Sequence, residues 1–238
     1  MVKWFKDKTG RFPERPHYEA SELDMECEHL VSTFLKNHKG KVEYPLTTDD
    51  LTLLVEHHVK VLDVYADLSA DGLDVEGVTR FAVREKPIIE ISETLSTAEH
   101  RSNRFRTTLA HELGHAKFHD HVFQAKFSSG NLFSSVRDER IVCKRDSMLE
   151  APQVDWMEWQ AGYASGAYLM PKSAVTALVR ALVPADAPIP PWSTDSELGR
   201  RLIRKVMSDF EVSEDAARVR LIKLNHLTSS PRVPTLFG

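Results

Sequence analysis

The segment His111-Glu112-Leu113-Gly114-His115 is the feature of this sequence that most constrains the fold. Two histidines four residues apart on a helix lie about 40° apart around its axis and one turn apart along it, so both imidazoles can reach the same ion. Glu112 is offset by about 80°, so its carboxylate flanks the ion and can accept the proton of an attacking water. The spacing therefore predicts a helix that binds a metal ion. The alternative interpretation places both histidines on the surface of an amphipathic helix.

Charge and apolar content narrow the classes of function. The net charge of −4 gives the chain no overall attraction to phosphate backbones or anionic lipids, so direct nucleic-acid binding is not expected. No apolar run approaches the roughly 20 residues that a membrane-spanning helix needs, and the N-terminus lacks the apolar core of a signal peptide. We therefore expect a cytoplasmic protein without a membrane partner.

Cysteine is scarce in this chain. Cys27 and Cys143 are the only two, which is too few for a disulfide framework or a cysteine-rich metal site. Histidine and carboxylate side chains must therefore hold any metal ion.

The hydrophobic pattern predicts an α+β fold in which a small mixed sheet packs on helices. Apolar residues at helical spacing predict two N-terminal helices within residues 17–58, the first of which ends at Gly40. Short β-branched segments with turn signals between them predict a three-stranded sheet within residues 59–92. The motif helix is predicted over residues 103–120 and a further helix over residues 155–170, with an irregular loop over residues 121–154.

The C-terminal part is predicted to be a helical appendage. Residues 183–194 contain four prolines, which prevent a continuous helix and are typical of a semi-rigid linker. Amphipathic helices are predicted over residues 195–210 and 213–225, the second capped by Ser213. The chain thus divides into a main domain over residues 1–182, a linker over 183–194 and a C-terminal helical region over 195–238.

A catalytic zinc site takes three protein ligands, so a third ligand must come from outside the motif. His121 lies ten residues after His111, a spacing that occurs in metalloproteases with a glycine three residues before the third histidine. Phe118 stands at this position and seldom adopts the positive φ that glycine provides, which weakens the case for His121. His119 is expected to be a polar residue at the end of the motif helix.

Glu158 is the second candidate for the third ligand. On the predicted helix 155–170 it shares a face with small residues, including Ala161 and Gly162. The motif helix carries a similar small stripe of Ala110 and Gly114, so the two helices can approach closely. The alternative is that Glu158 is a solvated acid near a helix N-terminus.

These residues together resemble a known family. The sequence RFRTTLAHELGH at residues 104–115, followed by EWQA at 158–161 and LMP at 169–171, resembles the ImmA/IrrE family of metallo-endopeptidases. The likeness extends over about residues 40 to 225. Two positions depart from the family pattern: Gly162 stands where Asn or Asp is frequent, and Ala164 stands where Phe is common. Both departures concern helix packing more than the chemistry.

The resemblance implies a minimal zincin fold and a zinc-dependent endopeptidase. It implies His111, His115 and Glu158 as ligands of one zinc ion and Glu112 as the general base. Mn, Fe or Co can occupy similar sites. It also implies a protein substrate, a helix-turn-helix transcriptional repressor whose cleavage induces mobile-element or stress-response genes.

Several details of the expected site stay open. Tyr163, His100 and His119 are candidates for a second donor to the oxyanion. The strand Ile88–Ser92 is expected to be the sheet edge that pairs with an extended substrate. The thiolate of Cys143 is a candidate inhibitory ligand at the open zinc position.

Two other classes of function compete with a peptidase. One is a regulatory or sensory zinc-binding module whose C-terminal helices contact a partner or DNA. Residues 196–226 carry seven Lys or Arg against five Asp or Glu, and this small excess argues against DNA. A structural zinc site also has no use for Glu112, which favours the enzyme. The other is a toxin-like or inactive member of the same family.

Overall fold

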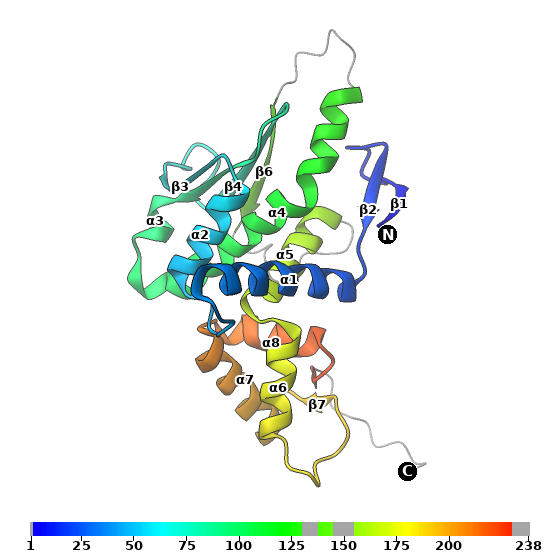
Figure 1. Ribbon diagram of the computed structural model, residues 1–238, viewed down its shortest axis with the longest axis vertical. Coiled ribbons are helices and arrows are strands. Elements are labelled where there is room, and N and C mark those ends of the chain that lie inside the picture. The colour runs from blue at the N-terminus through cyan, green and yellow to red at the C-terminus, as the bar shows by residue number, and fades with distance from the viewer. Residues whose placement is uncertain (1, 130–137, 145–154, 230–238) are drawn as a thin grey trace.

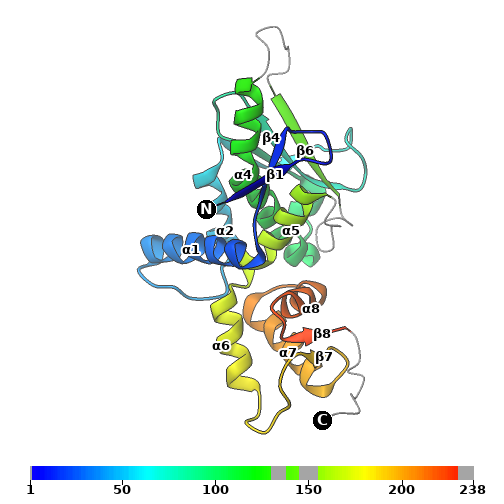
Figure 2. The same ribbon diagram turned by 90° about the vertical axis from the view of Figure 1, so that its right-hand side faces the viewer.

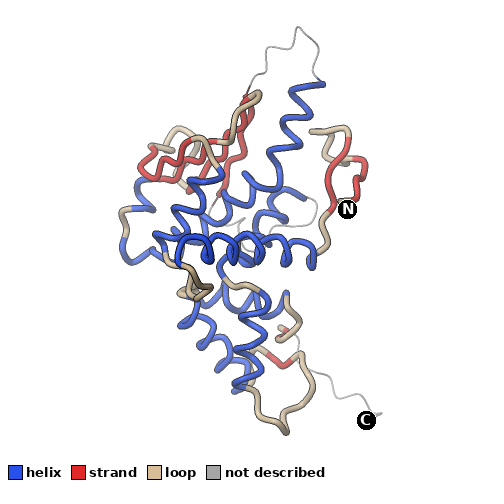
Figure 3. The backbone as a smooth tube through the Cα atoms, in the orientation of Figure 1, coloured by secondary structure: helices blue, strands red, loops and turns tan. Residues whose placement is uncertain are grey.

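The computed structural model describes residues 2–129, 138–144 and 155–229, and it has the expected α+β architecture (Figures 1 and 3). A mixed sheet stands beside the long helix α4, helices α2 and α5 pack against that helix, and α1 packs against α5. Helices α6, α7 and α8 form the opposite end of the molecule (Figures 1 and 2). The elements are β1 (Lys3–Lys6), β2 (Glu14–His17), α1 (Ala20–Lys39), α2 (Thr48–His58), β3 (Val61–Ala66), β4 (Val75–Ala82), β5 (Ile88–Ser92), α3 (Glu93–Ser96), η1 (Glu99–Arg101), α4 (Ser102–Ser129), β6 (Asp138–Lys144), α5 (Trp156–Leu169), α6 (Lys172–Leu182), β7 (Trp192–Ser193), α7 (Glu197–Phe210), α8 (Glu214–Lys223) and β8 (Leu227–Thr228).

The main sheet has the strand order β3-β5-β4-β6. β3 runs parallel to β5, and β4 runs antiparallel to both β5 and β6. β5 therefore lies inside the sheet, and the expectation that Ile88–Ser92 forms the edge is wrong, because β3 covers its other side. Within the described residues the edges of this sheet are β3 and β6.

β6 occupies part of the segment that was expected to be an irregular loop, so that expectation is wrong for residues 138–144. The strand begins with three charged residues, so its sequence does not show the alternation of apolar and polar residues that is typical of a strand. Only Ile141 and Cys143 are buried, and they alternate with more exposed neighbours as in a half-buried strand.

Helix α4 is longer than expected. It was predicted to end at Asp120, but it continues to Ser129. Val122 and Phe123 are buried in the added turns, where Phe123 stacks on Phe81 of β4 at 4.0 Å and meets Phe12 of the β1–β2 connection edge-on. These tertiary contacts stabilise turns whose own sequence gives a weak helical pattern.

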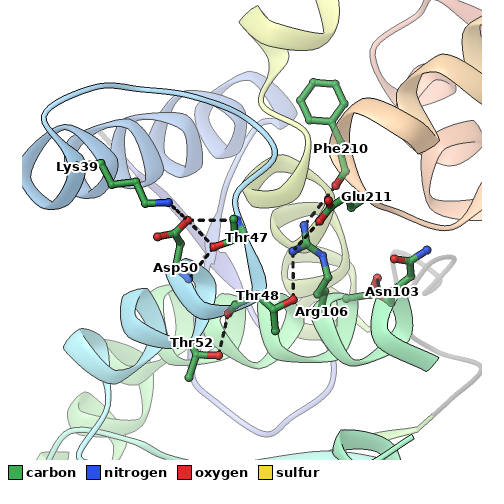
Figure 4. Close-up of polar contacts among 10 residues, drawn as sticks. Lys39, Thr47, Thr48, Asp50, Thr52, Asn103, Arg106, Phe210 and Glu211 are labelled. Carbon is green, nitrogen blue, oxygen red and sulfur yellow. Dashed lines mark hydrogen bonds and ion pairs between the residues drawn. The ribbon is translucent and has the colours of Figure 1, made fainter. Parts of the chain in front are cut away.

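The two N-terminal helices are present within the predicted residues, and the first ends at Gly40 as expected. Gly40 follows α1 with a φ of 74°, a left-handed conformation that glycine adopts at no steric cost. The side chain of Thr47 caps α2 by accepting from the backbone of Asp50, whose carboxylate also pairs with Lys39 (Figure 4). The lysine thus ties the end of α1 to the start of α2.

The C-terminal helices share one apolar core with the rest of the chain. The predicted helices 195–210 and 213–225 are present as α7 and α8, and Ser213 caps α8 as expected. The core that contains Leu109 and Tyr163 continues into Leu202 and Leu221, and α6 packs beside α7 (Figures 1 and 2). The division of the chain at residues 183–194 stays a prediction.

Two buried arginines link the C-terminal helices to the helices that precede them. Arg106 of α4 donates to the carbonyl oxygen of Phe210 at 3.3 Å (Figure 4). Arg220 of α8 donates to the carbonyl oxygen of Met170 at 2.9 Å and pairs with Asp24 of α1 at 2.7 Å.

None of the described helices combines the length and apolar character that crossing a bilayer requires.

Candidate metal centre

Three side chains from α4 and α5 converge in the interior. His111 and His115 project from neighbouring turns of α4, and their Nε2 atoms lie 3.0 Å apart. Glu158, in the first turn of α5, places Oε2 at 3.3 Å from Nε2 of His111 and Oε1 at 3.2 Å from Nε2 of His115. Both imidazoles are fully buried, and Glu158 is 8% exposed. The surface interpretation of the motif and of Glu158 is therefore wrong.

The separations of these donor atoms fit a metal ion. A tetrahedral zinc with bonds of about 2.0–2.1 Å separates its ligand atoms by about 3.3 Å. The two Nε2 atoms lie 3.0 Å apart, and each has one of the two oxygens of Glu158 at 3.3 or 3.2 Å. Both oxygens of Glu158 face imidazole nitrogens in the interior. A buried carboxylate is costly unless a positive charge compensates it, and a cation between these three side chains would do so.

Close packing of α4 on α5 makes the convergence possible. A Cβ added to Gly114 would lie only 3.0 Å from the Cα of Ala161, so a glycine is needed at this crossing. The two stripes of small residues thus meet as the sequence predicts. Ser165 further along α5 donates to the carbonyl oxygen of Thr107 at 3.1 Å, and Asp155 caps the first turn that carries Glu158.

Glu112 lies beside the three donors and is held by the sheet. Its Oε2 accepts a hydrogen bond of 2.6 Å from Thr79 of β4, whereas its Oε1 has no hydrogen-bond partner among the described residues. A Cβ added to Gly77 would lie 2.5 Å from Oε1, so only glycine leaves room for this carboxylate. Sequence reasoning missed both residues: a glycine inside a strand is a sign of close approach, whereas nothing marks Thr79.

Burial and mutual interaction shift the pKa values of the centre. Burial raises the pKa of Glu112, although both histidines and Thr79 oppose the shift. Burial alone would raise the pKa of Glu158, but His115 and His111 outweigh it and hold that pKa well below its usual range. Burial alone would lower the pKa of His115, but Glu158 outweighs it and the pKa is raised.

His119 lies behind His115, on the side away from His111. It was expected at a helix end, but α4 continues and buries it completely. Its Nδ1 is 3.0 Å from Nδ1 of His115 and its Nε2 is 3.1 Å from Oε1 of Gln160. Burial and the neighbouring His115 lower its pKa well below the usual value. Because both nitrogens are engaged, His119 does not fit the expected role of oxyanion donor.

The other expected oxyanion donors lie elsewhere. The hydroxyl of Tyr163 donates to Asp24 at 3.0 Å, in the cluster that contains Arg220, and burial raises its pKa to about 12. His100 is exposed on the short helix η1. The structure brings neither side chain to the metal-binding triangle.

His121 is not the third ligand. It lies edge-on to Trp4 with ring centroids 5.7 Å apart, and it belongs to no group of potential metal ligands among the described residues. The choice between the two candidates therefore falls to Glu158.

Cys143 lies next to the centre. β6 brings its buried thiol to a point where sulfur, a nitrogen of His111 and a carboxylate oxygen of Glu112 all lie within 4.8 Å of one another. Burial and the carboxylates of Glu112 and Glu158 raise the pKa of this thiol well above its usual value. The structure thus brings the proposed inhibitory residue near the metal site.

No protein-family model and no curated protein matches this chain.

Proposed function

We propose that this protein is a zinc-dependent endopeptidase of the ImmA/IrrE type, with His111, His115 and Glu158 as zinc ligands. The observation that carries the proposal is the convergence of these three buried donors, with the carboxylate of Glu112 beside them. A purely structural zinc site gains nothing from a fourth side chain that is a non-ligating acid held in place by Thr79. Mn, Fe or Co can take the place of zinc.

Bound zinc would supply Lewis acidity that activates a water and polarises the scissile carbonyl group. Glu112 supplies the base. Burial raises its pKa, which makes it a stronger proton acceptor than an exposed glutamate, and Thr79 anchors one of its two oxygens. Oε1 is then the atom that accepts the proton from the water and transfers it to the leaving amine.

The substrate is proposed to bind along β6 rather than along β5. β6 is an edge of the described sheet, and it carries Cys143, whose sulfur lies near a carboxylate oxygen of Glu112. An extended peptide that pairs with this edge is held through its main chain without strict sequence demands. The proposed substrate is a helix-turn-helix repressor in the cytoplasm, a class that comes from the family resemblance.

The test uses purified wild-type protein, Glu112→Gln and Glu158→Gln. Each is incubated with a helix-turn-helix repressor encoded beside its gene, with and without a chelator, and zinc content is measured in parallel. We expect wild type alone to cleave, Glu112→Gln to retain zinc without cleaving, and Glu158→Gln to lose both. Equal cleavage by wild type and Glu112→Gln would contradict the proposal and indicate a contaminating protease.

A zinc-binding sensor without turnover is the second candidate, and the position of Cys143 is the observation that favours it. A thiolate from this residue would close the centre. In the cobalt-substituted protein a thiolate ligand gives a sulfur-to-metal charge-transfer band. Loss of that band in Cys143→Ser, with no turnover by either protein, would support the sensor. A rise in turnover in Cys143→Ser would instead make Cys143 an inhibitory ligand of a peptidase, and an unchanged spectrum would exclude a thiolate ligand.

A further inference from the structure

A chain of hydrogen-bonding groups leads away from the metal centre behind His115. From the centre outward it consists of Nδ1 of His115, the two ring nitrogens of His119, the side-chain amide of Gln160 and the backbone carbonyl of Pro16 in β2. The successive distances are 3.0, 3.1 and 3.0 Å. His115, His119 and Gln160 are each at most 1% exposed, so no solvent replaces these contacts.

The outer end of the chain sets the direction of its hydrogen bonds. The carbonyl of Pro16 can only accept, so the NH2 group of Gln160 must face it. The amide oxygen of Gln160 then faces Nε2 of His119, and because that oxygen can only accept, Nε2 must carry a proton. In a neutral imidazole, Nδ1 of His119 is therefore an acceptor.

The inner end of the chain then has one arrangement compatible with a metal ion. A metal-bound imidazole needs a lone pair on the coordinating nitrogen, which for His115 is Nε2. Its proton must sit on Nδ1, which faces the acceptor nitrogen of His119. Metal binding makes Nδ1 of His115 a donor, and Gln160 makes Nδ1 of His119 an acceptor. The two nitrogens at this contact therefore match.

Packing holds the middle of the chain in place. The ring of Trp156 stands perpendicular to that of His119, with centroids 5.4 Å apart. Gln160 lies two residues after Glu158 on α5, and His119 lies one turn after His115 on α4. Each of the two helices therefore supplies both a proposed ligand and a group behind it.

We propose that His119 is a positioning residue that fixes the tautomer and orientation of His115 for metal binding. Gln160 in turn fixes which nitrogen of His119 carries the proton. This inference rests on the proposed metal centre and assigns a role to two residues that do not touch the ion. Partners of this kind typically change metal affinity by about 10- to 100-fold.

The test measures zinc affinity by competition with a chromophoric chelator, without any assay of turnover. We expect His119→Ala to bind zinc about 10- to 100-fold more weakly than wild type. His119→Asn places an amide oxygen near the position of Nδ1 and should restore most of the affinity. The zinc affinity of Gln160→Leu should lie between those of His119→Ala and His119→Asn. The matched control is His121→Ala, which removes a histidine from the same helix outside the chain and should bind zinc like wild type.

The tautomer is read independently from the nitrogen chemical shifts of ¹⁵N-histidine-labelled, zinc-loaded protein. We expect His115 to carry its proton on Nδ1 in wild type and in His119→Asn. If His119→Ala does not fold, as judged by circular dichroism, His119→Asn and Gln160→Leu still carry the test.

The outcomes separate this inference from the proposed function. Wild-type affinity in both His119→Ala and Gln160→Leu, or a proton on Nε2 of His115 in the zinc-loaded protein, would overturn the positioning role alone. Failure of the wild-type protein to bind zinc at His115 would overturn both proposals.

Discussion

Helix α5 borders two buried polar clusters whose charges are arranged differently. Toward its C-terminal half, Asp24 pairs with Arg220 at 2.7 Å and accepts from the hydroxyl of Tyr163. At its N-terminal end, Glu158 and the nearby Glu112 are buried with imidazoles, and no lysine or arginine pairs with either acid in the part of the chain that the structure describes. In the first, which we call the complete cluster, an arginine compensates the acid. In the second, which we call the incomplete cluster, only histidines face the two acids among the described residues.

This difference teaches how to distinguish a structural polar cluster from a candidate site. Buried charges are retained in a fold when an opposite charge or a metal compensates them. Arg220 compensates the charge of Asp24 and joins α8 to α1. The acids at the candidate metal centre have no such partner on a lysine or arginine among the described residues, which is the arrangement expected where a metal ion binds.

The largest effect is expected at the incomplete cluster when its base is removed. Glu112→Gln should lower kcat/KM on the cleaved repressor by about 10²- to 10⁴-fold, the usual contribution of a general base, while zinc content stays at the wild-type level. Turnover and bound zinc are measured on the same preparation. Loss of the zinc together with the activity would contradict the assignment of Glu112 as a non-ligand.

The complete cluster should respond in stability rather than in activity. Asp24→Asn leaves the guanidinium of Arg220 buried without its counter-charge and should lower the free energy of unfolding by about 3–5 kcal/mol. Denaturant titration of the metal-free protein measures this change. The matched control is Asp215→Asn, which breaks an exposed ion pair with Arg218 on the same helix and should cost less than about 1 kcal/mol. Equal effects of the two substitutions would show that the buried pair is not structural.

In the metal-free protein, removing a charge from the incomplete cluster should raise the free energy of unfolding, whereas removing Asp24 lowers it. Burial raises the pKa of Glu112, so the folded state favours its protonated form. Its contribution to stability is fully present below the pKa of the unfolded chain and is lost as pH rises through the raised pKa of the folded state. Metal-free Glu112→Gln should therefore be more stable than wild type at pH 8, by about 1–2 kcal/mol, and this advantage should vanish near pH 4. Denaturant titrations at both pH values provide the measurement, and an advantage that grows toward acid pH would have the wrong sign.

The smallest effect is expected from the hydroxyl that anchors the base. The bond from Thr79 favours the ionised form of Glu112, so Thr79→Val should raise the pKa of Glu112 further. The acid limb of the kcat/KM profile should then move to higher pH, with a loss of about 3- to 10-fold on that limb. Thr79→Ser keeps the hydroxyl and serves as the control. A uniform loss at every pH would indicate disturbed packing instead.

The sequence predicted the parts of the molecule that are encoded locally. The spacing of His111 and His115 requires only a helix, and the small residues around Gly114 and Ala161 marked the contact between α4 and α5. The capping signal of α8 is also local, at Ser213, and it is present. These features depend on few residues in one stretch of chain.

The remaining features depend on partners that are distant in sequence. The last turns of α4 are held by Phe12 and Phe81, and β6 is defined by its pairing with β4. The sequence made Tyr163 a plausible oxyanion donor, but its hydroxyl donates to Asp24 of α1, which also pairs with Arg220 of α8. The base itself is anchored from the sheet by Thr79, a residue type that carries no metal-site signal.

The most direct test of the account is a zinc-soaked crystal with anomalous diffraction data collected on both sides of the zinc absorption edge. The account predicts one anomalous peak bonded to Nε2 of His111, Nε2 of His115 and a carboxylate oxygen of Glu158, and no peak in Glu158→Gln. A peak elsewhere in the molecule, or one at the two histidines with Glu158 not bonded to it, would contradict the central claim.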